Sequence, residues 1–312
     1  FEERAMARFR LYAVVLLAGL LLASCVAPPI PTVTSTPGPA SPAAHPTASL
    51  EQVERSVVLI QMTWTAYVHV PAGNSQSGEA FWSDLVTAYV TCTGFFVSED
   101  AMIATAGHCV DPSVSGREAV VTQYLTDENS TDLIDTAVKN WTIEGEKADS
   151  NPALKITVFQ PTNLADAPLA KAQTAQVLDF QPFEKGDNAL LRIASLKGTP
   201  ALTLAKGTPA LGEAVTCIGF PAVISDVVDR TTLNRASFKP GSVSSKQTLP
   251  TGAPVTEVSA DLAPGMSGGP AVNSAAEVVG INSAGVGTSG GFNFVTDTDD
   301  LRLFLHRNGV EN

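Results

Sequence analysis

Short β-rich runs recur along the chain from about residue 50 onward. Clusters of Gly, Pro, Asn and Asp separate them, which is typical of strands joined by turns. This spacing predicts an all-β barrel or sandwich. The runs that predict strands are FWSDLVTAYVTCTGFFVS, AMIATAGHCV, EAVVTQYL, ALKITVFQP, NALLRIA, EAVTCIGFP, AEVVGINSAG and GGFNFVTD.

Two segments carry a different pattern. EQVERSVVLIQMTW, which begins just after residue 50, predicts a short helical turn that runs into a strand. Near the C-terminus, DTDDLRLFLHRNG predicts a helix that ends at Gly309. The apolar positions of this helix are Leu301, Leu303, Phe304 and Leu305.

The first 25 residues have the organisation of a targeting segment. Arg8 and Arg10 precede an apolar run over residues 11–22, and the string LASC ends at Cys25. LASC resembles the lipobox of bacterial lipoproteins, in which signal cleavage leaves the cysteine as the lipidated N-terminal residue. We therefore expect an extracytoplasmic protein, lipid-anchored to a bacterial cell membrane or secreted. A retained membrane span is the third option, although the run is shorter than the roughly 20 residues that cross a bilayer.

Residues 26–49 consist almost wholly of Pro, Ala, Thr and Ser. Such a segment has too little bulky apolar surface to fold, and its backbone favours extended polyproline II. We expect a disordered tether that holds the globular part off the membrane. His45 lies in this tether and is interpreted as a solvated histidine without a role.

Composition and charge narrow the class of protein. With 44% hydrophobic and 16% charged residues, the 312-residue chain can fill a substantial core. The formal net charge of −12 argues against a nucleic-acid partner, which requires a basic face. Because the sequence lacks the spacing of calcium loops, zinc sites and phosphate-binding loops, we expect no metal and no cofactor.

The candidate chemistry lies in three motifs: TAGHC at 105–109, GDNALLRI at 186–193 and PGMSGGP at 264–270. A serine hydroxyl becomes a nucleophile only with a base in hydrogen-bond reach, and an imidazole suits that role because it titrates near 6.5. The motifs supply His108 as the base, Asp187 as the carboxylate that orients it and Ser267 as the nucleophile.

The glycines around Ser267 fit this interpretation. Gly265, Gly268 and Gly269 permit a tight turn that exposes the hydroxyl. The backbone N–H groups of Gly265 and Ser267 would then point at the oxyanion of a tetrahedral intermediate. Asp187 precedes an apolar run, so its carboxylate would be buried and would require a partner such as a ring N–H.

Cysteine usage adds a prediction about the histidine loop. Cys92 and Cys109 flank a segment that predicts two strands and a turn. Pairing them would staple the strand before His108 to the loop that carries it, in the oxidising compartment that the signal implies. Cys217 lies in the apolar run AVTCIGF and is interpreted as a buried, inert thiol.

The three motifs resemble those of the chymotrypsin or trypsin-like serine peptidase superfamily, and so does their order, His then Asp then Ser. The resemblance implies two six-stranded antiparallel β barrels, over residues 50–195 and 196–312. The histidine and the aspartate would come from the first barrel and the serine from the second. Residues 111–181 align with nothing in the superfamily, and we expect barrel strands and surface loops there. The implied protein is a monomer that hydrolyses protein or peptide substrates through an acyl-enzyme.

The resemblance also implies residues that select the substrate. Asp261 stands six residues before the candidate nucleophile, where trypsin-like enzymes bind a substrate Lys or Arg; a surface or structural aspartate is the other interpretation. The segment GINSAG resembles the pocket wall, where Ser283 would hydrogen-bond the triad aspartate. Gly285 and Gly291 would leave room for a side chain, and the uncharged amide of Asn282 would favour small or apolar residues.

The sequence therefore predicts a serine endopeptidase displayed on the outer face of a bacterial membrane. A catalytically silent peptidase-like protein that captures a peptide or protein at the surface is the alternative, since a fold alone does not decide function. Three intact motifs favour the enzyme, because a binding protein has no need for all of them. Covalent labelling of Ser267 discriminates between the two.

Overall fold

The computed structural model describes residues 49–222, 235–286 and 292–311. The predicted signal segment with Cys25, His45 in the tether, and Gly291 lie outside these ranges. None of the helices within them is long and apolar enough to span a bilayer.

The first barrel closes because its first strand pairs on both edges, with β3 on one side and β6 on the other. The order around it is β1-β3-β4-β8-β7-β6, all antiparallel. Its strands are β1 (Val57–Val70), β3 (Val86–Phe96), β4 (Met102–Ala106), β6 (Ala153–Phe159), β7 (Gln173–Phe180) and β8 (Asn188–Arg192).

Strand β1 shows how the sequence builds this barrel. The short helix α1 (Leu50–Glu54) leads into it, as the pattern of EQVERSVVLIQMTW predicts. Along β1, buried positions such as Ile60, Met62 and Trp64 alternate with partly exposed ones. Because successive side chains of a strand point to opposite faces, this alternation places one face in the core.

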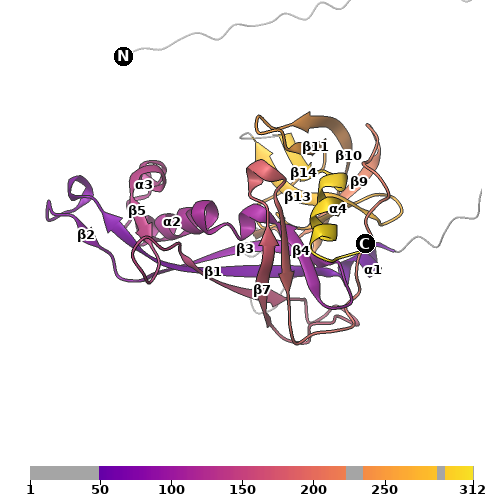
Figure 1. Cartoon of the computed structure of the whole chain (residues 1–312), viewed down its shortest axis with the longest axis horizontal. Coiled ribbons are helices and arrows are strands. Elements are labelled where there is room, and N and C mark those ends of the chain that lie inside the picture. Colours follow the sequence, from indigo (N-terminus) through magenta and orange to yellow (C-terminus); the bar gives the residue numbers. More distant parts are fainter. Residues whose placement is uncertain (1–48, 223–234, 287–291, 312) are drawn as a thin grey trace, which may run out of the picture. The chain divides into compact units, whose positions relative to one another are not determined.

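The far end of β1 extends beyond the barrel. There it pairs with β2 (Phe81–Trp82) and β5 (Thr142–Glu144). Helices α2 (Arg117–Asp127) and α3 (Ile134–Asn140) lie toward the same end (Figure 1), and α2 packs on both β1 and β3. The insertion over 111–181 therefore forms a helical layer on the first barrel.

The prediction of a strand at EAVVTQYL was wrong, since these residues form most of α2. The β-branched valines favoured the strand assignment. The buried residues of the helix are Val120, Val121 and Leu125, and the spacing from 121 to 125 is that of one helical face. Strands β6 and β7 confirm that the insertion also contributes to the barrel, whereas its two helices were not predicted.

The second barrel is closed in the order β10-β11-β14-β13-β12-β9. The two six-stranded barrels confirm the predicted fold class. The segment 193–213 joins them, so the expected boundary between residues 195 and 196 falls within it. The strands are β9 (Ala214–Gly219), β10 (Ser237–Thr248), β11 (Pro254–Val258), β12 (Pro270–Val272), β13 (Val278–Val286) and β14 (Phe292–Thr296).

The C-terminal helix α4 (Thr298–Arg307) is confirmed as well. The Asp297 side chain caps it by accepting from two backbone N–H groups of its first turn. Leu301, Phe304 and Leu305 are buried, and Gly309 takes the left-handed conformation that follows a helix end. Shorter helical turns are η1 (Ala72–Asn74), η2 (Gly107–Cys109), η3 (Pro112–Gly116), η4 (Thr131–Leu133) and η5 (Phe183–Lys185).

Candidate active site

His108 lies in the short turn η2 that directly follows β4. A disulfide joins Cys109 in the same turn to Cys92 in β3, as the sequence predicts. β3 and β4 are neighbouring strands of the first barrel, so the bond ties the histidine turn to the barrel wall. The imidazole is thereby held at the end of a rigid strand.

Asp187 stands in a turn between η5 and β8 that the backbone makes with two consecutive positive φ angles, 118° at Gly186 and 56° at Asp187. The left-handed conformation is uncommon for a non-glycine residue, although aspartate tolerates it better than most. Such outliers persist where the surroundings hold them and cluster at functional sites. The turn carries the Asp187 side chain into the interior, where the residue is 2% exposed.

The buried carboxylate of Asp187 accepts several hydrogen bonds. The backbone N–H of His108 donates to Oδ1 at 2.8 Å, and His108 Nδ1 lies 2.9 Å from Oδ2 and 3.1 Å from Oδ1. The Ser283 hydroxyl donates to Oδ2. Because an ionised carboxylate can only accept, Nδ1 carries the proton and Nε2 of the neutral ring is left as an acceptor.

The surroundings of His108 also set its protonation. Burial of the ring lowers its pKa, but the charge of Asp187, the hydrogen bond to it and the charge of Glu118 outweigh burial, so the pKa lies above its ordinary value. Glu118 belongs to the first turn of α2. The sequence did not single it out, because this segment was predicted to be a strand.

Ser267 lies in a turn that requires glycine on both sides. Gly265 and Gly268 have φ angles of 91° and 87°. A Cβ on Gly268 would lie 2.1 Å from the Thr93 carbonyl oxygen, and a Cβ on Gly269 would lie 1.9 Å from the Ile218 carbonyl oxygen. At Gly268 and Gly269 the backbone thus packs directly against the backbone of other strands, which excludes a side chain at both glycines.

Both barrels hold this turn. Thr93 of β3 donates its backbone N–H to the Ser267 carbonyl at 2.7 Å and its hydroxyl to the Gly265 carbonyl at 2.8 Å. Asn282 of β13 accepts the Gly268 N–H at its carbonyl, at 2.7 Å, and donates its side-chain amide to the Met266 carbonyl at 3.2 Å. The sequence did not indicate Thr93, because its role depends on an approach between strands far apart in the chain.

Two backbone donors beside the Ser267 side chain are free to act on a substrate. Within the described ranges, the N–H groups of Gly265 and Ser267 donate to no other group. The Ser267 hydroxyl donates to the Ser283 carbonyl at 3.2 Å, and among the described residues it makes no hydrogen bond with His108. Ser283 therefore contacts both sides of the site, through its hydroxyl to Asp187 and through its carbonyl to Ser267.

The residues expected to select the substrate occupy different environments. Asp261 is exposed in the segment after β11. The Asn282 side chain is fully buried and turned to the backbone of Ile218 and Met266, so it holds the serine turn. Gly285 lies in β13 opposite Asn293 of β14.

A family model for the trypsin-like peptidase domain matches residues 92–281. Among solved structures, the active form of the Rv3671c protease from M. tuberculosis is similar to the chain, with 18% identity, a TM-score of 0.50, and coverage of 90% of this chain and 96% of that one. The inactive form of that protease has 18% identity and a TM-score of 0.47, with coverage of 83% of this chain and 92% of that one. A search of curated proteins finds no match.

Proposed function

The chain belongs to the trypsin-like peptidase family, and from this premise we propose that it is a serine endopeptidase that cleaves peptide bonds through an acyl-enzyme. Its substrate is then a protein or a peptide. The observation that carries the proposal is the contact of His108 Nδ1 with the buried carboxylate of Asp187, 2.9 Å away. This contact leaves Nε2 as a base on the side of the ring away from the carboxylate.

In the first half of the reaction, Ser267 Oγ attacks the carbonyl carbon of the substrate. The Oγ proton passes to His108 Nε2, and the carbonyl electron pair moves to oxygen. The N–H groups of Gly265 and Ser267 donate to this oxyanion, and one such donor typically contributes about 10²- to 10³-fold in rate. The C–N bond then breaks, the proton on Nε2 passes to the leaving amine, and an acyl-enzyme remains.

In the second half, water takes the place of the amine. His108 Nε2 accepts a proton from the water as its oxygen attacks the acyl carbon. The tetrahedral intermediate collapses, the proton returns to Ser267 Oγ and the acid product leaves. Asp187 stabilises the imidazolium in both halves through its contact with Nδ1, and atoms and protons balance without a cofactor.

One rotation must precede the attack. The Ser267 hydroxyl donates to the Ser283 carbonyl, so it must leave this acceptor and turn to the imidazole before it can lose its proton. Catalytic hydrogen bonds are often long or misaligned without substrate and tighten when it binds. We infer that the approach of a peptide favours the rotated state.

The proposal is tested with a fluorophosphonate probe on the full chain, read by intact mass and peptide mapping. We expect one label per chain, on Ser267, and none after denaturation or in a His108→Ala variant. A folded chain without any label would contradict the enzyme and favour the silent binding protein. A label on another residue would contradict the role of Ser267.

The raised pKa of His108 predicts the acid limb of the pH profile. Catalysis requires the neutral ring, so kcat/KM should fall as the pH drops through a pKa above the ordinary 6.5. Glu118→Gln removes one charge that raises this pKa and should move the acid limb to lower pH. The measurement is kcat/KM against pH, with Asp127→Asn on the same helix as the control. An unmoved limb in Glu118→Gln would contradict the assigned cause.

We propose further that Cys25 carries a lipid and that residues 26–49 tether the peptidase to the outer face of a bacterial membrane. The lipobox-like string LASC and the Pro-rich composition support this location. The mass of the mature N-terminus, measured on chain extracted from the membrane fraction, tests it. An N-terminus without lipid would contradict the anchor at Cys25 and leave ordinary secretion or a retained membrane span as the explanation.

A further inference from the structure

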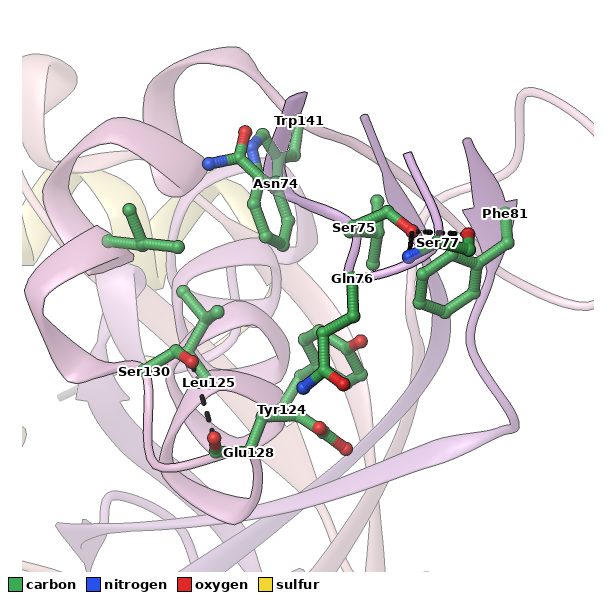
Figure 2. Close-up of a pocket in the computed structure, with 12 residues that line it drawn as sticks. Asn74, Ser75, Gln76, Ser77, Phe81, Tyr124, Leu125, Glu128, Ser130 and Trp141 are labelled. Atoms are coloured by element: carbon green, nitrogen blue, oxygen red, sulfur yellow. Dashed lines mark hydrogen bonds between the residues drawn. The ribbon is translucent and has the colours of Figure 1, made fainter. Parts of the chain in front are cut away.

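A cavity lies away from the candidate triad, between the extended end of β1 and the helical layer. Its volume is about 400 Å³. The end of β1, the turn after it and strand β2 form one side; the end of α2, the segment that follows it and Trp141 form the other. Figure 2 shows Gln76 reaching from the first side toward Tyr124 and Glu128 on the second.

The lining of this cavity has a definite chemical character. Three aromatic residues, Phe81, Tyr124 and Trp141, contribute to it, and the last two pack edge to face with ring centroids 6.4 Å apart. Glu128 is the single charged residue among the twelve that line it. In the described part of the chain, the Glu128 carboxylate and the side-chain amide of Gln76 make no hydrogen bond, which leaves both free for a ligand.

A cavity lined by aromatic rings and one carboxylate favours a cationic ligand over an anionic one. A guanidinium or ammonium group gains from the face of an aromatic ring within about 6 Å, and it pairs with a carboxylate. An anion would meet the charge of Glu128 without a compensating group. The flat guanidinium of arginine also offers five donors to the oxygens of Glu128 and Gln76.

The walls of the cavity are held firmly. Arg117 at the start of α2 donates to the carbonyls of Val138 at 3.0 Å and of Trp141, tying the end of α3 to α2. Trp141 directly precedes β5, which pairs with β1 at His69. The Trp141 ring and the Tyr124 ring that packs against it are therefore positioned before any ligand arrives, which reduces the entropy lost on binding.

Helix α2 links this cavity to the candidate active site. Its first turn carries Glu118, which acts on the His108 ring, and its C-terminal end carries Glu128. Ten residues of helix separate the two, or about 15 Å. An extended peptide advances about 3.3 Å per residue, so four or five residues cover the helix, and the stretch from Glu118 to the scissile bond adds to this number.

We propose that this cavity binds a basic side chain, arginine above lysine, of the peptide that the active site cleaves, at least four or five residues from the scissile bond. The proposal rests on the proposed function for the identity of the ligand as a substrate. The chemistry of the cavity itself does not depend on that function.

The binding test uses N-acetyl-arginine amide and N-acetyl-citrulline amide, which have nearly the same shape and differ in charge. NMR shifts of the Trp141 indole and of the Gln76 amide are followed during titration of the Ser267→Ala protein, in which turnover cannot interfere. We expect saturable shifts with the arginine compound and binding about tenfold weaker, or more, with the citrulline compound. Glu128→Gln should abolish the difference, and Asp127→Asn on the same helix should preserve it.

The kinetic test uses the unmodified enzyme and a series of peptides that carry arginine or citrulline at successive positions, from the fourth residue from the cleaved bond outward. We expect a kcat/KM ratio of about ten in favour of arginine, lost in Glu128→Gln, while the citrulline peptide is cleaved equally by both proteins. Equal binding of the two small compounds, or shifts away from the cavity, would overturn the site. If the fluorophosphonate probe does not label the chain but arginine binding depends on Glu128, the proposed function is wrong and the cation site is confirmed.

Discussion

Replacing Ser267 with alanine is expected to lower kcat by about 10⁶-fold, the size of the loss when the nucleophile of such a triad is removed. Without Oγ no acyl-enzyme forms, and neither His108 nor Asp187 can substitute for it. The variant should still exceed the uncatalysed rate in water by about 10³- to 10⁴-fold. This remaining acceleration would come from substrate binding and from the backbone N–H groups at positions 265 and 267, which the substitution leaves in place.

The measurement is the steady-state hydrolysis of a quenched-fluorescence peptide, with the melting temperature of each variant as the test of folding. Among the described residues the Ser267 side chain makes one hydrogen bond, to the Ser283 carbonyl, so Ser267→Ala should melt close to the unmodified protein. Ser274→Ala, on the exposed turn between β12 and β13 of the same barrel, is the matched control and should keep full activity. Activity of Ser267→Ala within about tenfold of the original would contradict the assigned nucleophile.

The sequence contained enough to predict the architecture and the three candidate catalytic residues, because both signals are local. Strand periodicity along β1 and the apolar stripe of α4 follow from neighbouring residues, and the structure has both. The motifs TAGHC and GMSGGP are likewise local, because a few neighbouring residues indicate the backbone conformation that each turn requires. Gly268 illustrates this, since a Cβ there would lie 2.1 Å from the Thr93 carbonyl oxygen.

Features that depend on contacts between distant segments were not predictable in the same way. Glu118 and Glu128 matter because α2 is a helix, and its valines favoured a strand when considered alone. The left-handed conformation of Asp187 and the contact of the Ser267 hydroxyl with Ser283 arise from packing around each residue. Asn282 was expected at the specificity pocket, but its amide is turned to the Met266 backbone, an orientation that only the three-dimensional register of β13 determines.

The Asp187→Asn variant is expected to lose about 10⁴-fold in kcat at neutral pH, the size of the loss when asparagine replaces the aspartate of such a triad. The reason lies in the donors that surround the carboxylate. The His108 backbone N–H donates to Oδ1, and Nδ1 and the Ser283 hydroxyl donate to Oδ2. The side chain of asparagine has one acceptor oxygen. The backbone N–H of His108 is fixed in position, so we expect the asparagine oxygen to stay hydrogen-bonded to it.

The asparagine NH₂ group then faces Nδ1, which must accept instead of donate. The ring proton consequently moves to Nε2, and a protonated Nε2 cannot take the proton of Ser267 Oγ. ¹⁵N NMR of labelled histidine reads this tautomer directly, and the kinetic loss should accompany it. Asp300→Asn is the matched control, because Asp300 of α4 accepts from the side chain of Asn188, the residue after Asp187, and makes no hydrogen bond to His108. Full activity with the proton still on Nδ1 would show that Asp187 does not orient the base.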